Sequence, residues 1–213
     1  MFQRLVDEID PSVVVSHAVI ERVLAGAVET GSVTGAMQLE TETAIHALVD
    51  EGATVVVCTC STIGGVAEAT KTRGAHVMRV DRPMAEQAVA SGRRIVVAAT
   101  LASTLRPTIA LIRQIAEHVD RDAEIVEVLC ADAWAHFERG DHAAYAHEIA
   151  RAVWAGARVS DIVVLAQASM AAAAPLIRGH GIPVLSSPEL GVRAALHMYH
   201  RDEGEPADRL PPG

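Results

Sequence analysis

One strand–helix–strand pattern occurs twice in this chain, and the repeat constrains the fold more than any other feature of the sequence. Residues 54–84 align without gaps on residues 161–191. In each copy an apolar run ends in a short polar turn, a helix of small residues follows, and a glycine precedes a second short run. Chance similarity of two βαβ units is the alternative, but the absence of gaps over the whole unit favours duplication. The turn carries Cys60 in the first copy and Gln167 in the second.

Apolar runs alternate with helical patterns along the rest of the chain. We predict strands over residues 13–16, 54–59, 76–80, 94–99, 124–130, 161–166 and 183–186. We predict helices over residues 18–27, 40–51, 63–73, 84–91, 103–118, 142–155, 170–178 and 190–199. Because the runs are continuous rather than alternating, the strands are expected to be buried on both faces in short, mainly parallel sheets flanked by helices. The predicted fold class is therefore α/β.

The repeat divides the chain into two similar lobes. We assign residues 1–92 and 187–200 to the first lobe and residues 93–186 to the second. The second lobe begins with a predicted strand, whereas none precedes the helical pattern at residues 2–9. Either the first lobe lacks its first strand or the natural chain starts upstream.

Two segments are expected to lack regular structure. Residues 201–213 are charged and rich in proline, which predicts a disordered tail. Residues 30–35 are rich in glycine and serine, which predicts a mobile loop.

Charge, apolar content and cysteine spacing limit the binding partners and the cellular compartment that this chain is expected to have. The formal net charge of −9 argues against nucleic acid or an anionic membrane as the main partner. The longest apolar stretch, 162–177, is interrupted by polar residues and a proline, and is too short to cross a bilayer. The first residues are acidic where a signal peptide needs an apolar run. The 3 cysteines have no paired spacing, so we expect free thiols in a reducing cytoplasm.

Cys60 is the residue most suited to chemistry. It follows the strand at 54–59 directly, at the carboxyl edge of the sheet where α/β proteins bind ligands. A thiol that opens a helix meets backbone N–H groups that favour the thiolate, and those groups, with the Ser61 and Thr62 hydroxyls, suit a carboxylate. A buried, inert cysteine is the alternative. We accept that alternative for Cys58, inside the strand, and for Cys130.

Four runs resemble motifs of one enzyme family, in the family's order. The run Cys-Ser-Thr-Ile-Gly-Gly-Val-Ala at 60–67 resembles the first cysteine motif of glutamate racemases, Cys-Asn-Thr-Ala-Ser-Ala-Val-Ala. The runs at 163–169, 97–103 and 183–187 are similar to that family's Leu-Gly-Cys-Thr-His, Gly-Thr-x-x-Thr and Val-Asp-Ser-Gly segments. The likeness covers most of the chain and is greatest to the broad aspartate/glutamate/hydantoin racemase group.

The resemblance implies a fold and a chemistry. Two pseudo-twofold-related lobes would enclose an active site in the cleft between them, without a cofactor. In that family two thiols face opposite sides of the substrate Cα, one removing the α-proton and the other returning it. The resemblance implies a small carboxylate or amino-acid substrate and, because relatives commonly dimerise, a possible homo-oligomer.

The resemblance also implies roles for individual residues. Cys60 is the expected catalytic thiol. The expected substrate contacts are Ser61, Thr62, Thr100, Ser103, Gln167, Ala168, Ser169, Ser187 and His17. The hydroxyls of Thr100 and Ser103 have simple helix caps as their alternative role, and His17 has a structural role as its alternative. No metal is expected, because His197 and His200 lack a convincing third ligand.

The sequence departs from the family pattern where the second thiol should stand. Gln167 occupies that position, and an amide has no useful acid–base chemistry near neutral pH, although it can donate to a carboxylate or an enolate oxygen. Ser61 and Ser169 replace the family's asparagine and histidine. One thiolate suits a one-sided reaction, as in arylmalonate decarboxylases or the maleate cis–trans isomerases. The alternatives are therefore a racemase, a one-thiol decarboxylase or isomerase, and a non-catalytic carboxylate-binding protein on this scaffold.

Overall fold

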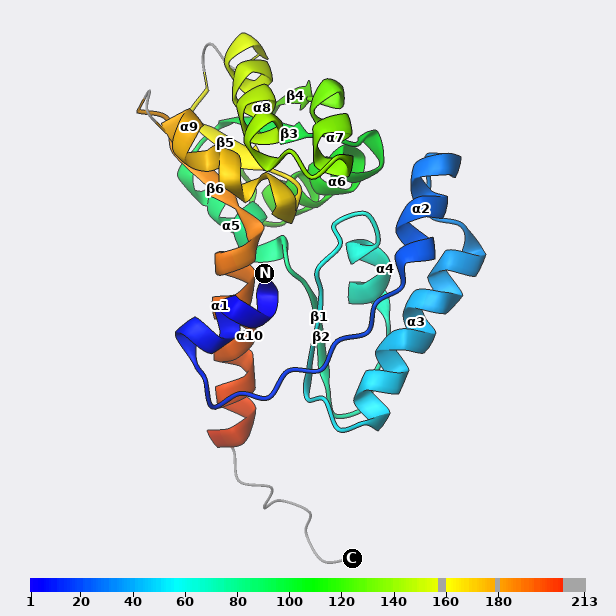
Figure 1. The fold of residues 1–213 in the computed structure, drawn as a ribbon. Helices are drawn as coiled ribbons and strands as arrows, with labels where there is room; N and C mark the ends of the chain where they lie inside the picture. The colour runs from blue at the N-terminus through cyan, green and yellow to red at the C-terminus, as the bar shows by residue number, and fades with distance from the viewer. Residues whose placement is uncertain (157–159, 179–180, 205–213) are drawn as a thin grey trace, which may run out of the picture.

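The computed structural model describes residues 1–156, 160–178 and 181–204, and contains two parallel sheets in two lobes (Figure 1). In the first lobe, β1 (Val55–Cys58) pairs in parallel with β2 (His76–Arg79). In the second lobe the strand order is β4-β3-β5-β6, and all neighbouring strands are parallel. These strands are β3 (Arg94–Ala99), β4 (Glu124–Leu129), β5 (Ile162–Leu165) and β6 (Val184–Ser186). The predicted α/β class is confirmed.

The second lobe contains the larger core. The side chains of β3 and β5 alternate between two buried clusters, one on each face of the sheet. The first face is covered by α7 (Ala131–Glu138), α8 (His142–Gly156), the short 3₁₀ helix η1 (Ala168–Ala173) and α9 (Ala174–Arg178). The second face is covered by α5 (Arg82–Ser91) and α6 (Ala102–His118). Burial on both faces explains why these strand sequences are apolar without alternation.

The first lobe has a smaller core. Ile45, Val56 and Ala67 form a cluster between β1 and two helices, α3 (Gly35–Asp50) and α4 (Gly64–Ala69). The helix α10 (Ser187–Gly204) leaves the second lobe and runs beside β1 and β2, against α1 (Phe2–Ile9) (Figure 1). The helix α2 (Glu21–Thr30) pairs with α3 at the edge of this lobe.

Several predicted elements differ from the structure. Residues 13–16 are not a strand; Val14 is 93% exposed and the segment pairs with no described strand. A β-branched run becomes a strand only where a neighbouring strand satisfies its backbone groups. The helix predicted at 170–178 is divided into η1 and α9, and α7 lies in a segment predicted as a connection.

The helices on either side of the predicted loop and before the predicted tail extend further than expected. Thr34 caps α3 by accepting a hydrogen bond from the Met37 N–H, so only residues 31–34 separate α2 from α3. The last helix continues to Gly204, four residues into the predicted tail, and residues 205–213 lie outside the described residues. None of the helices in the described part of the chain is both long and apolar enough to cross a membrane.

Candidate active site

Cys60 lies in the turn between β1 and α4, as a free and partly exposed thiol. The helix α4 begins only at Gly64 and has 6 residues. Contrary to the expectation from the sequence, Cys60 therefore does not lie at the first position of a helix. Because the helix dipole acts within the first turn, it contributes little at Cys60. The reactivity of the thiol therefore depends on the groups that surround the turn.

The other two cysteines differ from Cys60 in their environment. The Cys58 thiol donates to the Cys60 carbonyl at 3.4 Å, and burial raises its pKa to about 12. Burial also raises the pKa of Cys130 to about 11. Both thiols are therefore protonated at neutral pH, as a structural role requires.

Two hydrogen bonds join the Cys60 turn to the second lobe. The Ser61 hydroxyl donates to the Ala166 carbonyl at 3.0 Å, and the Thr62 and Thr104 hydroxyls lie 3.2 Å apart. Ser61, Thr62 and Thr104 are all buried. Ala166 directly precedes Gln167, so the two turns that the sequence repeat relates pack against each other between the lobes. We call these two hydrogen bonds the interlobe latch.

Gln167 is held by Thr100 at the end of the neighbouring strand. Its Oε1 accepts from the Thr100 backbone N–H at 2.6 Å and from the Thr100 hydroxyl at 2.8 Å. The oxygen must face Thr100, because a backbone N–H can only donate. Within the described part of the chain, the Gln167 amide nitrogen donates to no protein acceptor, so its two N–H groups are available to a ligand.

A buried tyrosine supports the same strand ends. The Tyr145 hydroxyl of α8 lies 2.9 Å from the Ser169 hydroxyl, and Tyr145 is 1% exposed. Burial raises the pKa of Tyr145 above its usual range, and hydrogen bonds with Ser169 and Thr100 oppose that shift. The sequence analysis did not identify Tyr145, because no motif marks a residue that reaches the site from a helix on the sheet face.

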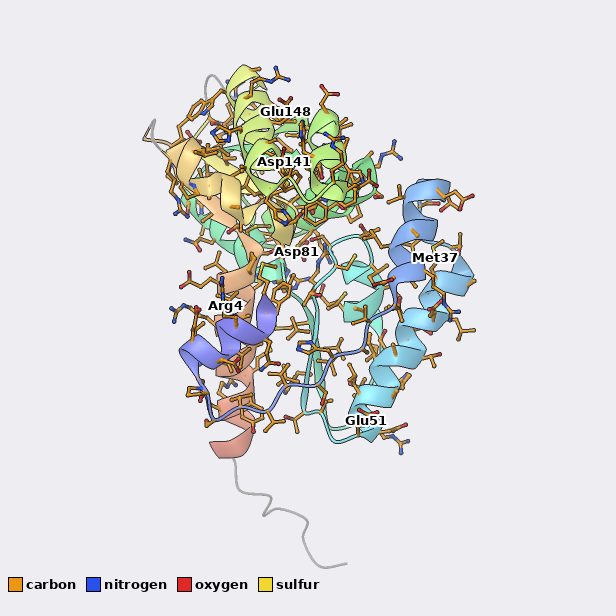
Figure 2. All side chains as sticks on the ribbon, in the orientation of Figure 1. Arg4, Met37, Glu51, Asp81, Asp141 and Glu148 are labelled. Carbon is orange, nitrogen blue, oxygen red and sulfur yellow. The ribbon has the colours of Figure 1, made fainter. Side chains whose placement is uncertain are left out.

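A buried ion pair, Arg79 with Asp81, lies next to the Cys60 turn. Arg79 ends β2 and binds Asp81 through two hydrogen bonds, of 2.6 and 2.9 Å. Both residues are buried, and Figure 2 labels Asp81 where the two lobes meet. The sequence analysis missed this pair too, although two charges at the end of a strand predicted to be buried were a signal that it could have used.

The remaining predicted contacts have different environments. Ala168 opens η1 beside Gln167. The hydroxyls of Ser103 and Ser187 are buried and have no hydrogen-bond partner among the described residues. His17 is exposed and pairs with Gln3, at 3.1 Å, so the structure does not join it to the strand ends. His200 pairs with Asp10 at 2.7 Å, at the far end of α10.

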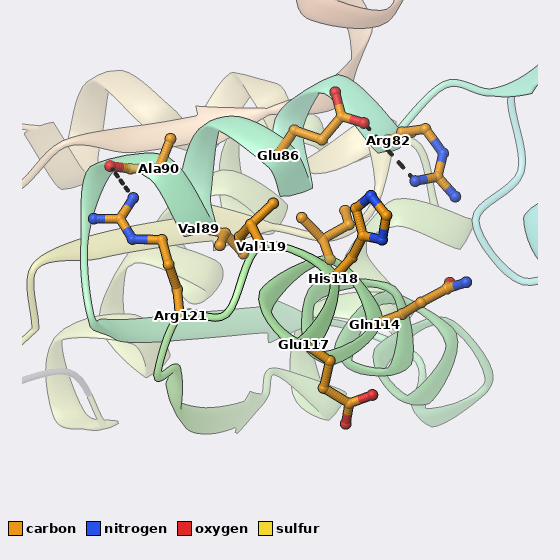
Figure 3. A pocket seen from close by; sticks show the side chains of 10 residues that line it. Arg82, Glu86, Val89, Ala90, Gln114, Glu117, His118, Val119 and Arg121 are labelled. Carbon is orange, nitrogen blue, oxygen red and sulfur yellow. Dashed lines mark hydrogen bonds and ion pairs between the residues drawn. The ribbon is translucent and has the colours of Figure 1, made fainter.

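Neither of the two cavities described for this structure is lined by Cys60 or Gln167. The larger, of about 810 Å³, lies between α5 and α6, and Figure 3 shows Arg82, Glu86, His118 and Arg121 around it. Of the hydroxyls expected to bind a carboxylate, those of Ser61 and Thr62 are bonded across the interlobe latch.

The fold matches those of known racemases. No family model and no curated protein matches the chain. Among solved structures, the aspartate racemase of Picrophilus torridus matches with a TM-score of 0.61 and 11% identity, over 93% of this chain and 88% of that one. The glutamate racemase of Francisella tularensis, in complex with D-glutamate, matches with a TM-score of 0.61 and 12% identity, over 99% and 80%. A glutamate racemase of Bacillus anthracis matches with a TM-score of 0.59 and 18% identity, over 82% and 70%. The chain therefore has the two-lobed fold of aspartate and glutamate racemases, as expected.

Proposed function

We propose that this chain is a cofactor-independent enzyme of the aspartate/glutamate/hydantoin racemase superfamily, acting at the α-carbon of an amino acid or small carboxylate through the Cys60 thiolate. The position of Cys60 carries the proposal. The thiol lies at the carboxyl end of β1, in the turn that meets the Gln167 turn of the other lobe through Ser61 and Ala166. The fold shared with racemases, one of them bound to D-glutamate, supports the substrate class. We place the enzyme in the cytoplasm, where its thiols would stay reduced.

In this proposal Cys60 is the only proton carrier. The thiolate takes the α-proton, and the electron pair of the broken C–H bond moves into the carboxylate to form an enediolate. The N–H groups of the Gln167 amide stabilise the negative oxygens but offer no proton near neutral pH. The Cys60 thiol exchanges its proton with water and returns a solvent proton to the same face, so the α-hydrogen exchanges without inversion.

The same arrangement supports decarboxylation of a substrate with two carboxylates on one carbon. The bond to one carboxylate breaks, CO₂ leaves with that carbon, and the electron pair stays as an enediolate. The Cys60 thiol then protonates Cα on one face and regains its proton from water. The fixed amide of Gln167 favours both one-sided reactions over a two-thiol racemisation.

The interlobe latch favours a further candidate, a carboxylate-binding protein without catalysis. The Ser61 hydroxyl can donate to a ligand only after its hydrogen bond to the Ala166 carbonyl breaks. Binding would then separate the lobes and report the ligand as a conformational change. Tight stoichiometric binding without turnover identifies this function.

Exchange of the α-hydrogen in deuterated water tests the proposal. The protein is incubated with each enantiomer of aspartate and glutamate and with an arylmalonate. Proton NMR follows exchange and loss of CO₂, and chiral chromatography follows inversion. We expect exchange without inversion, or one-sided decarboxylation, for one member of this panel, and no reaction with Cys60→Ser. Full activity of Cys60→Ser would refute the role of the thiol, and racemisation by the wild type would refute the role given to Gln167.

A further inference from the structure

Arg79, at the end of β2, contacts the turn that carries Cys60. It ends β2 opposite Cys58 in the strand register, and its side chain is 5% exposed. Its Nη2 donates to the Ser61 carbonyl at 3.4 Å, in addition to the bond that it makes to Asp81. The guanidinium therefore joins the residue after Cys60 to a carboxylate at the end of the neighbouring strand.

The start of α4 also rests on Arg79. A Cβ atom added to Gly64 would lie 2.8 Å from the Arg79 Nε and 3.1 Å from its Cβ. The guanidinium thus occupies the space that a larger residue at Gly64 would need. Arg79 contacts the turn both at Ser61 and at Gly64, so its position constrains the segment that carries Cys60.

Stability alone does not account for this pair. Asp81 is 0% exposed, and removing two charges from water costs several kcal/mol per ion before their attraction offsets it. A well-packed apolar pair of similar size is often as stable or more stable. The nearby Arg82 pairs with Glu68 and Glu86 instead, so Arg79 is the arginine that contacts the turn. Buried charges placed against a reactive group are typical of functional sites.

We propose that Arg79 is a positioning residue for Cys60, that it holds the turn through the Ser61 carbonyl, and that Asp81 fixes the guanidinium in place. This inference rests on the proposed role of Cys60 as the reacting thiol. Arg79→Met removes the contact with the Ser61 carbonyl and the support beneath Gly64, whereas Asp81→Asn keeps an oxygen that accepts from the guanidinium. Arg79→Met should therefore slow the reaction of Cys60 more than Asp81→Asn does, whereas a purely structural pair predicts the same loss from both.

The test measures alkylation of Cys60 by iodoacetamide and needs no substrate. The variants are Arg79→Met, Arg79→Lys and Asp81→Asn, with Arg82→Met as a matched control that removes an ion-paired arginine of the same region. Peptide mass spectrometry gives the alkylation rate of Cys60 from about pH 6 to about pH 10, the range over which thiols ordinarily titrate. Circular dichroism establishes that each variant is folded.

We expect Arg79→Met to slow alkylation of Cys60 several-fold throughout this pH range, because the turn loses its contact at the Ser61 carbonyl. Asp81→Asn should slow it less than Arg79→Met does, Arg79→Lys should recover part of the lost rate, and Arg82→Met should match the wild type. Equal slowing by Arg79→Met and Asp81→Asn, or a folded Arg79→Met with the wild-type rate, would overturn the inference. If Arg79→Met does not fold, Arg79→Lys decides: a rate several-fold below wild type supports the inference, and an unchanged rate refutes it.

These outcomes distinguish a failure of this inference from a failure of the proposed function. Altered alkylation with no turnover of any panel substrate supports Arg79 as a positioning residue and contradicts the enzymatic proposal. Turnover that depends on Cys60 but not on Arg79, in kcat or in KM, supports the enzyme and contradicts the inference.

Discussion

Gln167 accepts two hydrogen bonds from Thr100 through its side-chain oxygen, one from the backbone N–H and one from the hydroxyl. The two residues are 67 positions apart in the sequence and end the neighbouring strands β5 and β3. The amide is therefore held in one orientation, with its N–H groups as the part left for a ligand. In the proposed function, this amide takes the place of the second proton carrier of a two-thiol racemase.

Replacing Gln167 with cysteine should add inversion to exchange. Gln167→Cys places a second proton carrier at the position that the repeat relates to Cys60, so a substrate that exchanges without inversion should racemise. The Thr100 donors lose their acceptor, and we expect a stability loss of about 1–3 kcal/mol. Chiral chromatography and urea unfolding measure the two effects.

Gln167→Glu is the matched control for that prediction. A carboxylate keeps an acceptor for Thr100 but removes the N–H donors, so the variant should keep its stability and lose ligand binding. Exchange without inversion by Gln167→Cys would contradict the role given to this position.

Alkylation should distinguish the three cysteines by pH. The pKa values of Cys58 and Cys130 are raised to about 12 and about 11, so at pH 8 only about 10⁻⁴ and 10⁻³ of these thiols are thiolate. Both fractions increase tenfold with each pH unit, because the thiolate forms as pH rises toward the pKa. We expect iodoacetamide to label Cys60 alone in the folded protein at pH 8, as peptide mass spectrometry would show, and a Cys60→Ser variant to remain unlabelled. Equal labelling of Cys58 would show that its burial is not maintained.

Loss of the Thr104 hydroxyl should loosen the contact between the lobes. Thr104 and Thr108 are both buried in α6, but Thr104 faces Thr62 across the latch, whereas Thr108 donates to the Thr104 carbonyl within its own helix at 3.1 Å. Thr104→Val leaves the Thr62 hydroxyl without its partner and should cost about 1 kcal/mol. Thr108→Val should cost less than about 0.5 kcal/mol, because such bonds within a helix add little. Urea unfolding measures both costs, and hydrogen exchange in residues 60–64 should increase only in Thr104→Val. The same exchange in both variants would argue against the latch.

A methyl group at Gly191 should disturb the packing of α10 on the first lobe. A Cβ atom there would lie 2.5 Å from the Val80 carbonyl oxygen and even nearer a Val80 methyl, and the backbone cannot move aside cheaply. We expect Gly191→Ala to lose about 1–3 kcal/mol despite the higher helix propensity of alanine.

Gly26→Ala is the control for that prediction. Its Cβ atom would meet only the end of the flexible Met37 side chain, so the variant should be neutral or more stable by up to about 1 kcal/mol. Urea unfolding compares the two variants. A Gly191→Ala protein as stable as wild type would mean that α10 does not pack as described.

The sequence by itself determined the α/β class and the positions of most strands. The runs that became β3 and β5 are buried on both faces, so their apolar character is continuous and legible without a structure. The ungapped repeat determined that Cys60 and Gln167 are counterparts, because each follows an equivalent strand. The run at 13–16 misled the same reasoning, because β-branched composition does not reveal whether a neighbouring strand is present.

Only the tertiary structure decided which side chains meet at the strand ends. Ser61 reaches Ala166 across 105 residues of sequence, and Thr62 reaches Thr104 across 42, so no local pattern encodes either contact. The contact of Tyr145 with Ser169 and that of Arg79 with the Ser61 carbonyl depend in the same way on how helices and strands pack. The sequence identifies a residue suited to chemistry by its type and its place after a strand. The packing of the two lobes decides what surrounds that residue, because contacts between distant segments form only when the chain folds.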